Sequence, residues 1–215
     1  VKFVSENISP DISPVEMCSR ILNAVDAFYM GEIGDDSTVC AIRFKESNPV
    51  TIMIGPPINP ELDPIVVDKL VQSRGIKVVC GGTTSQIVST HTGEQLSVTL
   101  NYENPGIPPA AHIKGIDLVT EGVLTIGKTL DMLKRFPYMD RSEKVIALSK
   151  KDAASRLVRI LLEESTEVRF LVGRAINPAH QNPEMPISLG LKLNLIKEMK
   201  AELEKIGKIV NIEYF

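Results

Sequence analysis

Short apolar segments alternate with helix-like segments through most of the chain. Thr51 to Ile54 is apolar, a helix pattern begins at Asp63 and stops at Gly75, and Ile76 to Cys80 is apolar again. Two buried strands joined by a helix make a right-handed crossover unit whose strands run parallel. The pattern therefore predicts an α/β fold in which a mostly parallel sheet carries helices on both faces.

The alternation continues toward the C-terminus. Leu96 to Leu100 alternates apolar with polar residues, which is typical of a half-exposed edge strand, and Ile116 to Val119 is a short apolar segment. Asp152 is the expected cap of a helix that starts at Ala153. The remaining predicted elements are helices at 124–135 and 153–162, a strand at 168–172, a helix that ends near Gly207 and a strand at 208–213.

The N-terminal residues follow a different pattern. Ser13, Pro14 and Glu16 form a capping box with proline at the first helical position, which predicts a helix from about Pro14 to Met30. Ser37 to Phe44 is rich in Thr, Val and Ile and predicts a buried strand. A polar break beginning at Lys45 separates this helix and strand, in residues 1–46, from an α/β domain in residues 47–215.

Composition excludes several classes of protein. The 215 residues carry a formal net charge of −3 with acids and bases intermixed, so no basic stripe is present to bind nucleic acid. The longest apolar runs fall far short of the ~20 residues needed to span a membrane. Cys18, Cys40 and Cys80 are odd in number and lie among apolar neighbours, which indicates reduced thiols and a cytoplasmic protein. Because the chain begins at Val1 without an initiator methionine, we expect it to be part of a larger protein.

An acidic turn, Gly34-Asp35-Asp36-Ser37-Thr38, directly precedes the predicted strand. Adjacent carboxylates can hold Mg²⁺ or Mn²⁺, because these ions prefer oxygen ligands. The alternative is that Asp36 only ends a turn, which is a common role for aspartate.

The stretch GDDSTVCAIRF, residues 34–44, follows an amphipathic helix and resembles the last motif of PPM-type (protein phosphatase 2C-like) serine/threonine phosphatases of the stage II sporulation E family. Three later segments, VCGGTTSQIV, GIDLVTEGVLTI and FLVGRAINPAHQNPEMPI, resemble a C-terminal extension found in one bacterial branch of that family. The resemblance covers most of the chain. It implies the C-terminal region of a bacterial metal-dependent phosphoprotein phosphatase, followed by a regulatory or ligand-sensing domain.

In that family, the first Asp of the Asp-Asp-x-Thr pattern is a ligand of a centre with two metal ions, Mn²⁺ or Mg²⁺, whose bridging water attacks the phosphoserine or phosphothreonine phosphorus. The resemblance assigns this role to Asp35, with Asp36 supporting the turn or serving as a second candidate ligand. The chain contains no Asp-Gly dipeptide, although these enzymes take their other metal ligands largely from such motifs. We therefore expect this chain to be inactive without an upstream catalytic region, whose substrate would be a phosphoprotein.

Two groups of residues near predicted strand ends are candidates for ligand binding. Gly81, Gly82, Thr83 and Thr84 open a predicted helix, where backbone amides and hydroxyls can bind an anion. The alternative for this group is a tight turn with threonine as a cap. Asp117, Thr120 and Glu121 lie around the end of the next predicted strand, and their alternative role is helix capping.

A third candidate group lies in a long polar loop after the strand predicted at 168–172. Loops that merely connect two elements tend to be short, so this loop is a candidate for function. Its polar members are Arg174, Asn177, His180, Gln181 and Asn182.

Loops that follow successive parallel strands share one edge of a sheet. We therefore expect the strand ends at Cys80, Val119 and Val172 to lie side by side and to bring the three groups into one polar pocket. Backbone donors and Arg174 suit an anion, while the acids suit hydroxyls, so the expected ligand is a phosphorylated or carboxylated metabolite with hydroxyl groups. Two alternatives remain: a free-standing small-anion-binding module, and a dimerisation domain that forms a homodimer.

Overall fold

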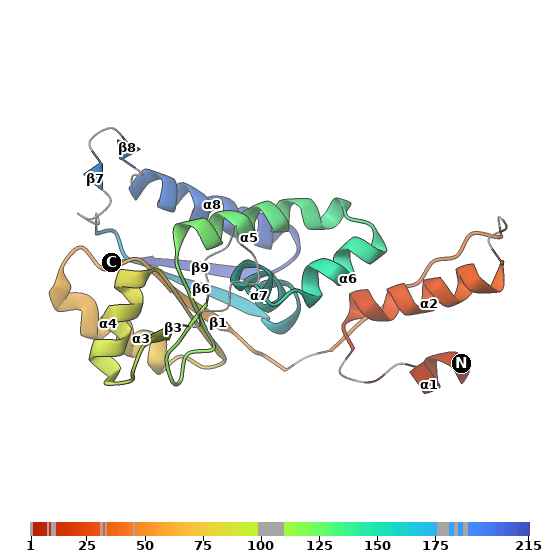
Figure 1. The fold of residues 1–215 in the computed structure, drawn as a ribbon, viewed down its shortest axis with the longest axis horizontal. Helices are drawn as coiled ribbons and strands as arrows, with labels where there is room; N and C mark the ends of the chain where they lie inside the picture. The colour runs from red at the N-terminus through yellow and green to blue at the C-terminus, as the bar shows by residue number, and fades with distance from the viewer. Residues whose placement is uncertain are drawn as a thin grey trace.

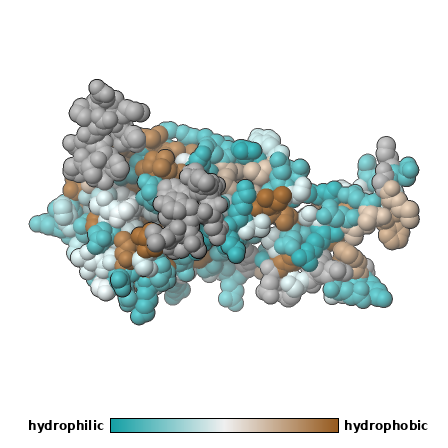
Figure 2. All heavy atoms as spheres, viewed as in Figure 1, coloured by the Kyte–Doolittle hydropathy of each residue, from teal (hydrophilic) through white to brown (hydrophobic). Residues whose placement is uncertain are grey.

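The computed structural model describes residues 2–7, 9, 12–30, 32, 34–44, 46–98, 110–175, 181–182, 185–186 and 189–215. Residues from Asn48 onward form an α/β unit around a sheet, whereas two N-terminal helices, α1 (Lys2–Asn7) and α2 (Pro14–Phe28), extend to one side of it (Figure 1). Figure 2 shows that the viewed surface of this unit is largely hydrophilic, with small apolar patches between the polar side chains.

Among the described residues, seven strands form one sheet in the order β3-β4-β5-β2-β1-β6-β9. The neighbours β5, β2, β1, β6 and β9 are parallel, while β3, β4 and β5 pair antiparallel at one edge. The predicted mostly parallel sheet and its edge strand are therefore confirmed. The strands are β1 Val50–Ile54, β2 Ile76–Cys80, β3 Ser97–Val98, β4 Ala111–His112, β5 Leu118–Thr120, β6 Glu167–Val172 and β9 Ile209–Tyr214.

Helices cover both faces of the sheet. Because successive residues of a strand point to opposite faces, neighbouring residues of one strand pack in different cores. In β1, Ile52 packs in a core with α5 (Val123–Arg135), α7 (Ala153–Arg159) and α8 (Leu189–Lys205). Its neighbour Met53 belongs to a second core with α3 (Asp63–Val71) and α4 (Gly82–Thr92). The prediction of helices on both faces is confirmed, with α5 and α8 on one side of the sheet in Figure 1 and α3 and α4 on the other.

Side-chain caps fix the starts of two helices in the second half. The Asp152 carboxylate accepts the Ser155 N–H at 3.0 Å, as predicted, and α7 continues as a π-helix, η3 (Ile160–Glu164). Helix α6 (Arg141–Ser149) was not predicted, although Asp140 and Glu143 form a capping box at its start. The short elements are the 3-10 turns η1 (Pro60–Leu62) and η2 (Phe136–Tyr138) and the hairpin of β7 (Gln181–Asn182) and β8 (Met185–Pro186).

Helix α2 begins as the sequence predicts. The Ser13 hydroxyl accepts the Glu16 N–H at 3.1 Å and Pro14 is the first helical residue. The Glu16 carboxylate does not close the capping box and instead forms an ion pair with Arg20, at 2.5 Å. The helix ends at Phe28, two residues before the predicted end.

The strand predicted at Ser37 to Phe44 is wrong. Residues 34–44 form an extended segment without regular structure, and the side chains of Ile42 and Phe44 are 77% and 95% exposed. The segment lies against α2, where the Cys18 thiol donates to Val39 O at 3.9 Å, and the Arg43 guanidinium donates to Ile12 O, just before the helix, at 2.7 Å. A strand requires a neighbouring strand to pair its backbone groups, and none of the described strands pairs with this segment.

Asn48 is held to the α/β unit by two hydrogen bonds. Its N–H donates to Thr166 Oγ1 at 2.9 Å and its amide side chain donates to Glu164 O at 3.0 Å. The predicted boundary between residues 46 and 47 lies directly before this contact. Helix α2 also contacts the unit, through an ion pair between Asp26 and Arg141 of α6 at 2.7 Å. No helix in the described part of the chain is long and apolar enough to cross a membrane.

Candidate functional site

The carboxyl ends of the five parallel strands lie along one edge of the sheet. At this edge β5 and β2 are neighbours, so Thr120 is the register partner of Cys80. Val172, at the end of β6, instead pairs with Ile54 of β1, and β1 separates it from β2. The three predicted strand ends therefore share one edge, but only those of β2 and β5 are direct neighbours.

Two glycines follow these neighbouring strand ends and lie in backbone contact. Gly81 has φ +117° and Gly122 has φ +132°, values that side-chain-bearing residues rarely adopt. The Gly81 N–H donates to Thr120 O at 2.9 Å, which extends the pairing of β2 with β5 by one step. A Cβ on Gly122 would lie 3.1 Å from Gly81 Cα, so the close approach also requires glycine.

Each glycine is the residue before a helix, and neither helix has a side-chain cap. The first intrahelical hydrogen bonds of α4 and α5 run from the Ser85 N–H to Gly81 O and from the Ile126 N–H to Gly122 O. The amides before these have no carbonyl partner within their own helix, and they carry the positive end of the helix dipole. Since α4 and α5 cover opposite faces, two helix N-termini converge on one point of the edge. A Cβ on Gly82 would meet nothing within 4 Å, so a side chain fits at the first position of α4.

Buried threonine hydroxyls adjoin this point. Thr120 Oγ1 and Thr125 Oγ1 are both buried and have no oxygen or nitrogen partner among the described residues. Thr120 contacts the Cys80 thiol, which is a weak hydrogen-bonding group. Most buried hydroxyls in proteins are hydrogen-bonded, so the Thr125 hydroxyl, in the first turn of the uncapped helix α5, lacks an expected partner.

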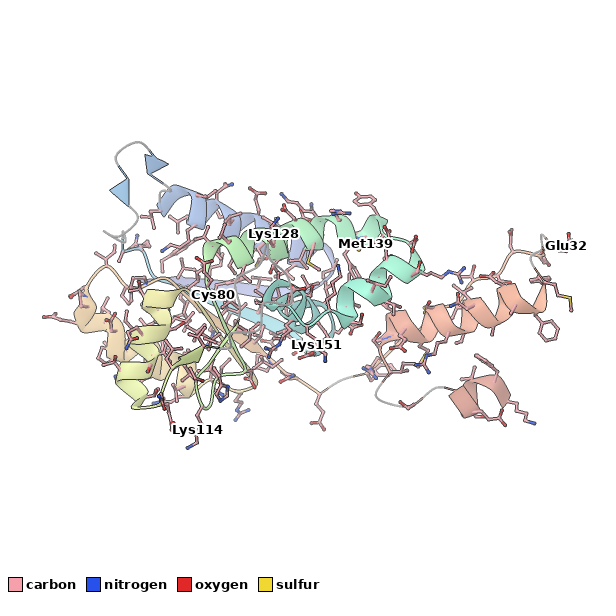
Figure 3. The ribbon with its side chains drawn as sticks, viewed as in Figure 1. Glu32, Cys80, Lys114, Lys128, Met139 and Lys151 are labelled. Atoms are coloured by element: carbon pink, nitrogen blue, oxygen red, sulfur yellow. The ribbon has the colours of Figure 1, made fainter. Side chains whose placement is uncertain are left out.

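Cys80 lies in the interior of the α/β unit (Figure 3). Burial raises the pKa of its thiol to about 12, the Thr120 hydroxyl lowers it slightly, and the nearby Glu121 carboxylate raises it further. A thiol with this pKa is not a nucleophile near neutral pH. Cys80 therefore belongs to the core and not to the chemistry of the site.

Asp117 does not belong to this group, contrary to the prediction. β5 begins at Leu118, so Asp117 lies at the amino end of the strand and Glu121 at the carboxyl end. The Asp117 carboxylate accepts the Lys77 N–H at 2.8 Å and so replaces a missing step of the strand pairing. The strand predicted at Ile116 to Val119 starts two residues later, at Leu118, because Ile116 closes the turn at Lys114 and Gly115, where its N–H donates to Ile113 O at 3.1 Å.

The structure brings together Gly81, Gly82, Thr83, Thr84, Thr120 and Glu121. Arg174 is exposed and shares the edge, but it follows β6. Asn177 and His180 lie outside the described residues, as do the side chains of Gln181 and Asn182, whose backbones form β7. Sequence reasoning missed Gly122 and Thr125, although Gly122 repeats the strand-glycine-helix pattern of Gly81.

The acidic turn at Asp35 offers few ligands for a metal ion. Asp35 and Asp36 are exposed, and Asp35 Oδ1 accepts the Asp36 N–H at 2.9 Å. Over the described ranges, no three His, Cys, Asp or Glu side chains are grouped so that they could hold a metal ion. The residues present here do not fit a two-metal centre, and a site that includes Asp35 would need further carboxylates.

Comparison of the chain with protein-family models, with curated proteins and with solved structures gave no match.

Proposed function

We propose that residues 47–215 form a ligand-sensing domain that binds a small anion at the carboxyl ends of β2 and β5 and regulates a protein serine/threonine phosphatase. The observation that carries the proposal is the convergence of two uncapped helix N-termini, from opposite faces of the sheet, on the touching pair Gly81 and Gly122. Backbone amides at helix starts bind phosphate and carboxylate groups in many α/β proteins.

The side chains around the glycines define the ligand class. Thr84 Oγ1 lies beside Gly81, and the buried Thr125 hydroxyl, which has no partner among the described residues, adds a further donor. The exposed Glu121 would repel a bare anion but accepts hydrogen bonds from hydroxyl groups. A phosphorylated or carboxylated metabolite that also carries hydroxyl groups satisfies both requirements.

The phosphatase part of the proposal rests on the resemblance of residues 34–44 and the later segments to the stage II sporulation E family. Asp35 stands at an exposed turn after α2, where it is accessible to metal and to further ligands. The proposal includes a cytoplasmic location, Mn²⁺ or Mg²⁺ bound by the longer enzyme and a phosphoprotein substrate. In this arrangement the α/β unit senses and the upstream region catalyses.

Amide chemical shifts can test the anion site. We would titrate ¹⁵N-labelled protein with inorganic phosphate and with glucose 6-phosphate, and follow the amide signals of Gly81, Gly82 and Gly122. Gly82→Pro removes one amide donor while suiting the first position of a helix, and Gly82→Ala is the matched control that keeps the amide. Saturable shifts that weaken several-fold in Gly82→Pro and persist in Gly82→Ala are expected.

The proposal is contradicted if neither phosphate compound shifts these signals, or if Gly82→Pro binds as tightly as Gly82→Ala. If neither compound binds and the protein sediments as a homodimer, a role as a dimerisation domain is favoured instead. A change in the activity of the longer enzyme on addition of the ligand, absent in Gly82→Pro, would connect sensing to the phosphatase.

A further inference from the structure

Lys192 of α8 reaches the point where the loops after β1 and β6 touch. Its ammonium group donates to Gly173 O at 2.5 Å. A Cβ on Gly55 would lie 2.4 Å from Lys192 Nζ and 3.0 Å from Gly173 O, so glycine at 55 makes room for the amine. A Cβ on Gly173 would in turn lie 2.1 Å from Pro56 O. Two glycines and one lysine thus meet at the carboxyl edge.

This point is the topological switch point of the sheet. The chain passes from β1 to β2 and then to β5 in one direction, and afterwards places β6 and β9 on the other side of β1. In open α/β sheets, ligands bind outside the carboxyl ends of the two strands from which the chain departs in opposite directions. Here those strands are β1 and β6, and the amine of Lys192 lies at their ends.

The charge of Lys192 is not neutralised within the described part of the chain, where no carboxylate lies within ion-pair distance of its amine. Lys200 of the same helix provides a contrast. It also donates to a backbone carbonyl, Val210 O at 2.8 Å, but it pairs with Glu204 at 3.0 Å. Burial lowers the pKa of Lys192 because a desolvated ammonium group is disfavoured without a partner. An anion at this point would supply that partner.

We propose that Lys192 is the cationic anchor of a binding site for a small oxyanion group, phosphate or carboxylate, at the switch point between β1 and β6. The site lies apart from the Gly81 and Gly122 pair, which follows β2 and β5, and each can be present without the other. Lysine suits this role because it binds phosphate or carboxylate as a compact point charge. The exposed Arg174, which follows Gly173, is a second cation at the same strand end.

The test titrates the full ¹⁵N-labelled chain with two probes, inorganic phosphate and malonate, and follows its amide signals. A titration with sodium chloride at equal ionic strength is the control for each probe. The signals of Gly55 and Gly173 report this site, whereas those of Gly82 and Gly122 report the site of the proposed function. We expect one or both probes to shift Gly55 and Gly173 saturably. Lys192→Met should weaken that shift at least about tenfold, while Lys200→Met leaves it unchanged. Phosphate and malonate distinguish the two sources of the oxyanion.

Lys192→Arg keeps the charge and covers the case in which Lys192→Met does not fold. A Gly55 and Gly173 response that is retained in Lys192→Arg and lost in Lys192→Met supports the anchor. If neither probe shifts these two signals beyond sodium chloride, or if the shift is equal in wild type and Lys192→Met, then Lys192 only caps the Gly173 carbonyl. Because separate signals report the two sites, a failure here leaves the Gly81 and Gly122 result intact.

Discussion

Gly122 packs directly on Gly81, so that a Cβ on Gly122 would lie 3.1 Å from the Gly81 Cα and 3.3 Å from the Gly81 N. This contact joins the end of β2 to the end of β5 and sets the relative positions of two helix N-termini. Both residues have positive φ, so the backbone conformation and the contact each require the absence of a side chain. The same contact that positions the amides also stabilises the edge of the sheet.

Gly122→Ala should lower the free energy of unfolding by about 1–3 kcal/mol, because alanine is strained at this φ and its Cβ meets the backbone of Gly81. Gly82→Ala is the control, since a Cβ there meets nothing within 4 Å. The control should stay within about 1 kcal/mol of wild type. Urea unfolding measures both variants, and equal stability of the two would contradict the role of the contact.

Asp152→Ala should cost about 1 kcal/mol of stability, since it removes the acceptor for the Ser155 N–H at the start of α7. Asp152→Asn retains an oxygen acceptor and should recover most of the loss. Thermal unfolding of the three proteins provides the measurement. A loss as large in Asp152→Asn as in Asp152→Ala would show that the cap is not the cause.

Cys80 should resist thiol reagents in the folded protein, while the exposed Cys40 reacts readily. With a thiol pKa of about 12, only about one Cys80 in ten thousand is ionised at pH 8, and burial blocks access as well. A variant with Cys18→Ser and Cys40→Ser isolates Cys80, and its labelling should begin only at denaturant concentrations that unfold the sheet. Rapid labelling of this variant in native buffer would refute the assignment to the core.

Lys192 should make stability rise with pH at the alkaline end. Its pKa in the folded state is lowered below the ordinary value of 10.5, so between these values the unfolded chain binds more protons than the folded one. Below the folded-state pKa, the buried ammonium group lowers the free energy of unfolding by its full amount. This destabilisation disappears as the pH rises to 10.5. The stability of wild type minus that of Lys192→Met should therefore increase across this window, as measured by urea unfolding. A constant or falling difference would contradict the assignment.

The chain of 215 residues should not hydrolyse a phosphopeptide in the presence of Mn²⁺, because its described residues hold no group of carboxylates suited to two metals. In a longer protein that supplies the missing ligands, Asp35→Asn should reduce phosphatase activity by orders of magnitude. Circular dichroism should show an unchanged fold. Full activity in Asp35→Asn would show that the resemblance does not extend to this residue.

The strands and helices of the α/β unit were predictable because their signals are local. β1 and β2 are continuous apolar segments, and α7 starts at a visible Asp152 cap. The predicted strand at Ser37 to Phe44 failed because its composition suits a strand but the described chain offers it no partner. Helix α6 was missed although its capping box at Asp140 and Glu143 was present in the sequence.

For the candidate site, the sequence determined the chemistry of each loop: glycines at strand ends, threonines in first helical turns and the acidic pair at Asp35. Tertiary structure alone decided which of these meet. Strand order placed β1 between β2 and β6, and a shift of two residues in β5 moved Asp117 to the opposite edge of the sheet. Lys192 carries no local signal, because it is one of several lysines on α8. Its importance arises from a long-range contact with Gly173, and such contacts depend on packing between elements that are distant in sequence.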